Sequence, residues 1–207
     1  MIELYLVRHG HTPGNELGRY VGTTDESLSP AGRAALRRYR CPEVEAVYAS
    51  PMRRCVQTAG ILWPGVPVYF IEKLRECDFG EFENKNYLEL AENPAYQAWV
   101  DSGGSLPFPG GESGADFRTR CREGFVEALK EIQRTKKRRA AFVVHGGTIM
   151  SILEAYAVPR HDFYHWQVKN GKGFCTWWDE TDEGGVKLYE TNGFDPDPGA
   201  SSGSDLR

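Results

Sequence analysis

Two histidines in this chain, His9 and His145, each follow a short apolar run and precede a glycine. Such runs are typical of buried strands, and in open α/β sheets chemistry gathers just outside the carboxyl ends of the strands. Arg8 stands directly before the first histidine, so a permanent cation and a neutral nucleophile occur side by side. A site for a phosphoryl group needs this combination. The pattern therefore predicts that two strand ends bring His9 and His145 to the same edge of a sheet.

A third cation for this site is expected from Arg53. Ser50 and Pro51 are typical of a helix start, so the sequence predicts Arg53 in a first turn whose backbone N–H groups also favour anions. Arg8 and Arg53 could each make bidentate contacts with phosphate oxygens, and His145 could donate a further hydrogen bond. A solvated surface arginine is the alternative interpretation of Arg53 taken alone.

The elements that must position these groups alternate along the chain. Apolar runs predict strands over residues 2–7, 45–49, 68–70, 140–144, 174–178 and 186–189, with the last two as a hairpin at the sheet edge. Capping residues and helical periodicity predict helices over residues 29–38, 51–62, 87–90, 96–100, 113–132 and 147–157. The alternation predicts a layered α/β fold with a mainly parallel sheet.

One irregular stretch and the C-terminal end depart from this alternation. Residues 72–112 are expected to form a substrate lid, because connections of that length inside compact domains are usually functional. The length favours a single domain, placed over residues 1–194. Residues 195–207 are rich in Pro, Gly, Ser and Asp, and are expected to be a disordered tail.

Composition narrows the range of partners and compartments. A net charge of -4 argues against nonspecific nucleic-acid binding. Five scattered cysteines without a CxxC pair suit reduced thiols in the cytoplasm, and no segment resembles a signal peptide or a membrane span. We expect a cytoplasmic protein with a small-molecule partner and neither nucleic acid nor membrane as partner. The oligomeric state stays open, with a homodimer as one option.

Other motifs carry less weight. His161 and His165 have the i, i+4 spacing of a metal pair, but no third ligand accompanies them in the sequence, so no metal is expected. A GxSxG pattern at residues 199–203 lies in the expected tail, without the strand and helix that a nucleophile elbow needs. The chain contains no Cys-x5-Arg motif, Walker loop or Rossmann fingerprint.

Taken in order, several short motifs resemble the histidine phosphatase superfamily, the phosphoglycerate mutase-like proteins. They extend over most of residues 2–150: Arg8-His9-Gly10 with Thr12 and Asn15 downstream, Leu-Ser-Pro-Ala-Gly at 28–32, Ser-Pro-Met-Arg at 50–53, Leu-Arg-Glu at 74–76, and His145-Gly146. The resemblance implies a three-layer α/β/α sandwich with a lid insertion. His11 and Asn84 depart from the family's commonest residues at their positions.

The resemblance also implies roles for individual residues. His9 would attack phosphorus and become a phosphohistidine, while Glu76 would protonate the leaving oxygen and then activate water. Arg8, Arg53 and His145 would act with them in catalysis by neutralising the charge of the transferring phosphoryl group, with Asn15 as a further donor. The residues expected to bind the substrate are Arg8, Arg53, His145, Asn15, Thr12, Thr23 and Gly146. General chemistry agrees, because a covalent intermediate divides one difficult displacement into two, and arginines can stabilise the charge without a metal or other cofactor.

Glu81 and Glu83 compete with Glu76 as the proton donor, and the match at Leu-Arg-Glu favours Glu76. Residues 77–83 carry three carboxylates and no cation. A glycerate substrate would place a second anion there, so this composition favours a phosphomonoesterase over a mutase.

The amino-acid sequence of the lid looks most similar to that of the α-ribazole phosphatase branch, and broad-specificity relatives share much of this pattern. Phe79, Phe82, Tyr87 and Trp99 are expected to cover an apolar or heterocyclic group, unless they only pack a core of the lid itself. Two alternatives stay open: a cofactor-dependent phosphoglycerate mutase, and a catalytically silent protein that binds a phosphorylated ligand.

Overall fold

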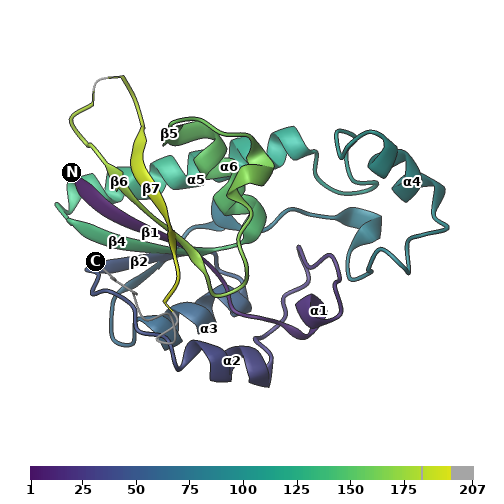
Figure 1. Cartoon of the computed structure of the whole chain (residues 1–207), viewed down its shortest axis with the longest axis horizontal. Coiled ribbons are helices and arrows are strands. Elements are labelled where there is room, and N and C mark those ends of the chain that lie inside the picture. Colours follow the sequence, from purple (N-terminus) through teal and green to yellow (C-terminus); the bar gives the residue numbers. More distant parts are fainter. Residues whose placement is uncertain (183, 197–207) are drawn as a thin grey trace, which may run out of the picture.

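The computed structural model describes residues 1–182 and 184–196 of the chain. Within these residues a seven-stranded sheet has the strand order β3-β2-β4-β1-β6-β7-β5 (Figure 1). The strands are β1 (Ile2–Arg8), β2 (Ala46–Ala49), β3 (Val68–Phe70), β4 (Arg139–Val144), β5 (Ala157–Val158), β6 (Gly173–Trp178) and β7 (Leu188–Phe194). The predicted tail over residues 195–207 lies outside the described residues except for Asp195 and Pro196.

Strands β1 to β4 are mutually parallel, as predicted. Strand β6 runs antiparallel to both β1 and β7, which gives the predicted hairpin. The hairpin is not at the edge, however, because the short strand β5 pairs with β7 and takes that position. A two-residue edge strand has no sequence periodicity from which it could be predicted.

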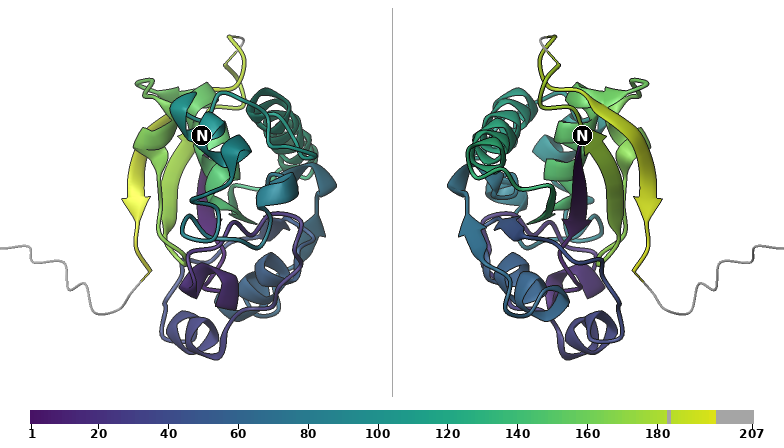
Figure 2. Two further views of the ribbon diagram at one scale, coloured as in Figure 1. Left: turned by 90° about the vertical axis from the view of Figure 1, so that its right-hand side faces the viewer. Right: turned by 90° about the vertical axis from the view of Figure 1, so that its left-hand side faces the viewer.

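Helices cover both faces of the sheet (Figures 1 and 2). Helices α5 (Gly114–Arg134) and α6 (Gly146–Tyr156) pack with the core residues of one face, and α2 (Pro30–Leu36) and α3 (Arg53–Leu62) with those of the other. The architecture is therefore the expected α/β/α sandwich. The predicted apolar stripe of α5 is buried throughout: Phe117, Cys121, Phe125, Ala128, Leu129 and Ile132.

Serine caps begin two of these helices at the predicted residues. The hydroxyl of Ser29 accepts the N–H of Gly32, and that of Ser113 accepts the N–H of Asp116. Helix α3 is different, since it begins at Arg53 and its N-cap is Met52. The short helix α1 (Pro13–Glu16) was not expected from the sequence.

Residues 72–112 extend away from the sheet, on the right of Figure 1. They contain two single-turn helices, η1 (Glu72–Leu74) and η2 (Gly80–Phe82), and the helix α4 (Pro94–Asp101). Residues 87–90, predicted as helical, form turns instead. Phe82, Leu90, Tyr96 and Phe108 pack with Phe117 of α5 in a small separate core. The 72–112 segment therefore has a small hydrophobic core of its own, to which α5 also contributes.

Among the described residues, no helix combines the length and the apolar character needed to cross a membrane.

Candidate active site

Three neighbouring strands deliver side chains to one edge of the sheet. Strand β4 lies between β1 and β2, with Arg8 opposite Val144 and Ala49 opposite Val143. The residues that follow these strand ends, His9, His145 and Ser50, therefore meet at one place. The rings of His9 and His145 are 5.2 Å apart between centroids, and both side chains are buried. The structure thus brings the two predicted histidines together.

His9 is held in the form that a nucleophile needs. Its Nδ1 lies 2.7 Å from the carbonyl oxygen of Gly10, so Nδ1 carries the hydrogen and donates it. The lone pair is then on Nε2. Burial, together with the nearby Arg54 and Arg8 guanidinium groups, holds the pKa of His9 well below its ordinary value. His9 is therefore neutral at neutral pH, with Nε2 free to attack.

Arg8 brings its guanidinium group against the same site. Nη1 donates to the carbonyl oxygen of Val168 at 2.8 Å, while Nε is buried without a hydrogen-bond partner among the described residues. An unpaired buried donor costs free energy unless a ligand satisfies it. A Cβ atom at Gly146 would lie 3.4 Å from this group, so glycine leaves room beside the cation. Arg8 is thus suited to donate a hydrogen bond from Nε to an anionic oxygen.

The second cation of the site is Arg54, and the prediction of Arg53 is wrong. Arg53 is exposed at the first position of α3, and its backbone N–H donates to the carboxylate of Asp25. Arg54 is completely buried. The reason lies in the helix start: the chain stays extended through Met52, so the helix begins later than a Ser50 cap would place it. The next position after Arg53 then turns inward.

Arg54 is anchored by four hydrogen bonds. Its Nε donates to Nδ1 of His145 at 3.3 Å, and its Nη atoms donate to the carbonyl oxygens of Val21, Gly22 and Thr24. Because arginine only donates, Nδ1 of His145 is an acceptor. The hydrogen of His145 is then on Nε2, which lies 2.8 Å from Oγ of Ser50.

His145 is therefore neutral as well, and burial and Arg54 hold its pKa well below the ordinary histidine value. Both of its nitrogens are engaged in this arrangement, with Arg54 and Ser50. To donate a hydrogen bond to a phosphoryl oxygen, His145 would have to give up its hydrogen bond with Arg54 or with Ser50.

Glu76 follows η1 and is partly buried beside the start of α6. Its Oε1 accepts the N–H of Cys77 at 3.0 Å, and a Cβ atom at Gly147 would lie only 2.8 Å from the same oxygen. Burial raises the pKa of Glu76 above the ordinary carboxyl value, although Arg8 and Arg54 oppose that rise. A raised pKa increases the fraction of enzyme in which this carboxyl group is protonated, and a general acid must be protonated before it can donate.

The two competing carboxylates lie elsewhere. Glu81 is exposed. Glu83 accepts the backbone N–H groups of Gly22 and Thr24, both at 2.8 Å, and so holds the loop whose carbonyl groups anchor Arg54. Glu76 is thus the carboxyl that the structure places with Arg8 and Arg54.

Thr12 and Asn15 form a reciprocal cap at the start of α1. Thr12 is fully buried and its hydroxyl accepts the N–H of Asn15, so Thr12 supports Asn15 and is not open to a ligand. Oδ1 of Asn15 accepts from Nδ2 of Asn170, which also donates to the carbonyl oxygens of His9 and Gly10. Asn170 was not predicted, and no motif in the sequence marks it. Thr23 is exposed and lines an open groove beside Glu76.

Residues 4–189 match the family model of the histidine phosphatase superfamily, branch 1. The chain belongs to this superfamily and is a phosphatase. It is 32% identical over 161 residues to a Hydrogenobacter thermophilus protein with the provisional name phosphoserine phosphatase 2, covering 74% of this chain and 77% of that one. It is 27% identical over 188 residues to the adenosylcobalamin/α-ribazole phosphatase of Salmonella typhimurium, covering 82% and 87%.

The fold has solved counterparts. The crystal structure of the α-ribazole phosphatase from Shigella flexneri superposes with a TM-score of 0.77 at 23% identity, covering 86% of this chain and 92% of that one. The phosphoglycerate mutase-like fold expected from the sequence is confirmed.

In this histidine phosphatase a cavity of about 520 Å³ opens from Glu76 and Gly147 toward the lid. Seven aromatic residues line it: Tyr20, Phe79, Trp99, Phe108, Phe117, Phe163 and Tyr164. Of the four lid aromatics expected to cover a substrate, Phe79 and Trp99 line the cavity. Phe82 is buried in the lid core, and Tyr87 is 64% exposed and away from the cavity.

One cation also faces this cavity. Arg118 of α5 lines it, with its guanidinium 5.0 Å from the ring centroid of Phe163. Arg118 shares Glu154 with Arg122, so one carboxylate is paired with two cations and the three groups keep a net positive charge. The absence of a cation from residues 77–83 therefore does not leave the whole cavity without one.

The histidine pair of the i, i+4 pattern is stacked. The rings of His161 and His165 are 3.9 Å apart between centroids and nearly parallel. Among the described residues, no group of three or more metal-ligating side chains comes together.

Proposed function

We propose that this histidine phosphatase hydrolyses phosphomonoesters through a phosphohistidine at His9. The observation that carries the proposal is the bond from Nδ1 of His9 to the carbonyl oxygen of Gly10, which leaves Nε2 as a neutral nucleophile beside the buried Arg54 and the partly buried Arg8. Nε2 attacks phosphorus, and the ester oxygen leaves. Phosphoryl transfer depends mainly on positioning and charge stabilisation, which Arg8 and Arg54 supply in this scheme without a metal or other cofactor.

Glu76 is the proton donor and then the base in the same scheme. It gives its proton to the leaving alkoxide, and the resulting carboxylate takes a proton from the water that hydrolyses the phosphohistidine. The raised pKa of Glu76 supports the first of these roles. A catalytically silent ligand-binding protein would need neither a proton donor nor a free histidine nitrogen.

For the substrate we propose a small phosphate ester in the cytoplasm whose organic part fills the aromatic cavity. A flat heterocycle such as that of α-ribazole phosphate would stack on Phe79 or Trp99. A second candidate, phosphoserine, is supported by Arg118, because a carboxylate in the cavity would need a cation, and by the names of relatives. A phosphoglycerate mutase is the less favoured alternative, since residues 77–83 are acidic.

The covalent step is tested by trapping. The enzyme is mixed with an activated aryl phosphate and quenched in alkali, and the phosphorylated peptide is identified by mass spectrometry. We expect the label on His9, its loss in His9→Asn, and its retention in His11→Asn, which alters the exposed neighbouring histidine. Full turnover in His9→Asn, or loss of wild-type turnover on adding a chelator, would contradict the proposal.

The substrate is tested by comparing kcat/KM for α-ribazole phosphate, phosphoserine, an aryl phosphate and 3-phosphoglycerate, with isomerisation of the last followed separately. Arg118→Gln should lower kcat/KM for phosphoserine selectively if a carboxylate binds there. Efficient isomerisation of 3-phosphoglycerate would instead assign the chain to the mutases.

A further inference from the structure

Arg120 of α5 contacts the backbone of Glu76 and uses all five N–H donors of its guanidinium group in hydrogen bonds. Nε and Nη2 bind the carboxylate of Glu112 at 2.9 and 2.7 Å. Nη1 donates to the carbonyl oxygens of Lys73 and Arg75, and Nη2 donates also to that of Glu76 itself, at 3.2 Å. The planar fork of one arginine thus holds three backbone carbonyl groups at the proton donor.

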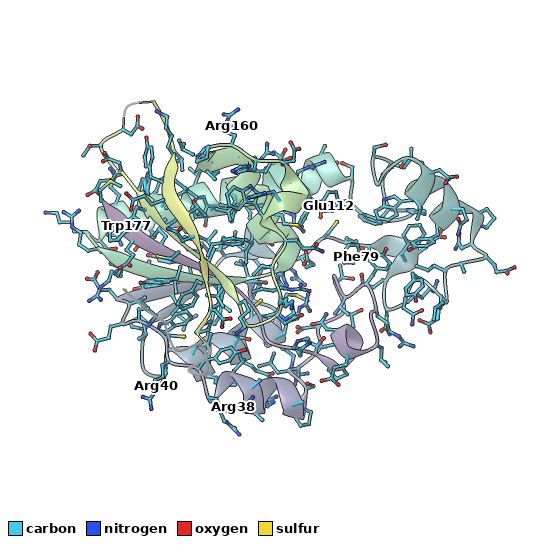
Figure 3. The ribbon with its side chains drawn as sticks, in the orientation of Figure 1. Arg38, Arg40, Phe79, Glu112, Arg160 and Trp177 are labelled. Atoms are coloured by element: carbon cyan, nitrogen blue, oxygen red, sulfur yellow. The ribbon has the colours of Figure 1, made fainter. Side chains whose placement is uncertain are left out.

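Glu112 completes this arrangement from the other end of the lid. Its backbone N–H donates to the carbonyl oxygen of Asp78, and its carboxylate binds Arg120. Gly111 packs so closely that a Cβ atom there would lie 2.4 Å from the same carbonyl oxygen. The two ends of the 72–112 segment are therefore joined directly beside Glu76. Figure 3 labels Glu112 and Phe79 of this segment.

These contacts fix position more than they change charge. The bidentate carboxylate of Glu112 neutralises Arg120, so little net field from the pair reaches the site. The bonds to Lys73, Arg75 and Glu76 instead hold the backbone from which the Glu76 side chain extends. Catalytic groups need such support, because a displacement of about 1 Å at the reacting atoms can cost roughly a hundredfold in rate.

We propose that Arg120 and Glu112 are positioning residues for proton transfer by Glu76. The pair holds the Glu76 backbone at the base of the lid so that its carboxyl group meets the leaving oxygen. The inference rests on the proposed role of Glu76. It also assigns the lid a function other than covering the substrate: its closed base positions the acid.

The test uses the dependence of kcat/KM on the leaving group, because kcat/KM includes departure of the alcohol. Removing a general acid costs about a hundred- to ten-thousandfold with poor leaving groups and little with activated ones. Arg120→Met should therefore lower kcat/KM about 10- to 100-fold for an alkyl phosphate and only a few-fold for para-nitrophenyl phosphate. Glu112→Gln, which keeps the shape of the pair, should show the same pattern to a smaller extent.

Glu123→Gln is the matched control. It removes the exposed ion pair between Lys73 and Glu123, which joins the same two segments at 2.9 Å without a contact to Glu76. Its kcat/KM should match wild type for both esters. Thermal unfolding of every variant separates loss of fold from loss of positioning.

The double variant Arg120→Met/Glu76→Gln should be no slower on the alkyl ester than Glu76→Gln alone, because the arginine acts through the carboxyl group. An equal loss on both esters in Arg120→Met and in Glu112→Gln, or additive losses in the double variant, would overturn the inference. If Glu76→Gln itself lacks the leaving-group pattern, the proposed function fails instead.

Discussion

The Nε–H of Arg54 donates to Nδ1 of His145 across 3.3 Å, and both side chains are fully enclosed by the protein. The bond joins the start of α3 to the end of β4 and sets the tautomer of the histidine. It also holds the guanidinium group in place before any substrate binds. Charge stabilisation is most effective when its donors are already oriented, since nothing then has to reorganise during the reaction.

The adjacent arginines of α3 give a direct test of this geometry. Arg54→Met should lower kcat/KM about a hundred- to a thousandfold, the usual effect of losing one oriented donor to a transition state. Arg53→Met should leave kcat/KM close to wild type, because Arg53 is exposed. Steady-state kinetics on one aryl phosphate are sufficient. The reverse ranking would make Arg53, and not Arg54, the second cation of the site.

Glu83→Gln should reduce stability without changing the dependence on the leaving group. The Glu83 carboxylate accepts two backbone N–H groups, and its replacement weakens both bonds. We expect the free energy of unfolding to fall by about 1–3 kcal/mol, measured by urea denaturation. Glu81→Gln, at an exposed position, is the control and should be as stable as wild type. A leaving-group effect in Glu83→Gln would make it a rival of Glu76.

Stability should decline as the pH falls below about 6.5, the ordinary pKa of histidine. His9 and His145 have lowered pKa values in the folded protein, so below that pH the unfolded chain binds more protons and is favoured. Each histidine contributes up to about 1.4 kcal/mol per pH unit within this window. The raised pKa of Glu76 acts in the opposite direction at lower pH.

A comparison of variants separates the contribution of His9 to this pH dependence from that of other groups. The Tm of wild type, His9→Asn and His11→Asn is measured between pH 5.5 and 7.5. The slope should flatten in His9→Asn and persist in His11→Asn, since His11 is exposed. Identical slopes in all three proteins would contradict a neutral buried His9.

Two aromatic residues of the lid should differ in their effect on substrate binding. Trp99 lines the cavity, so Trp99→Leu should raise KM several-fold for an ester with a heterocyclic group and leave kcat almost unchanged. Tyr87 is 64% exposed and outside the cavity, so Tyr87→Leu should change neither constant. Equal effects would mean that the organic group lies elsewhere.

The sequence predicted what local pattern and strand order control. Apolar runs ending in His9 and His145 located the two strand ends, and parallel pairing brought them together. The serine caps of α2 and α5 depend on nearest neighbours, so they too were predictable.

The errors arose where a tertiary contact overrides a local signal. Ser50 is a good cap by type, yet its hydroxyl bonds to His145, and α3 begins three residues later. Because of this shift, Arg54 and not Arg53 faces the site. Rules based on neighbouring residues in the sequence cannot predict such a shift. Asn170 likewise gains its role only because its loop folds back onto His9 and Gly10.

The order of the strands has a consequence for biosynthesis. Strand β1 precedes both of its partners by most of the chain, since Glu3 pairs with Arg139 on one side and with Trp177 on the other. The ribosome therefore releases an apolar segment that has no neighbour until β4 and β6 have followed it. Pairings over such separations close slowly, and segments that wait for them are targets for chaperones and for aggregation. Under the proposed mechanism a nascent chain has no phosphatase activity until β4 has been made, because His9 follows β1 near the start of the chain and His145 follows β4.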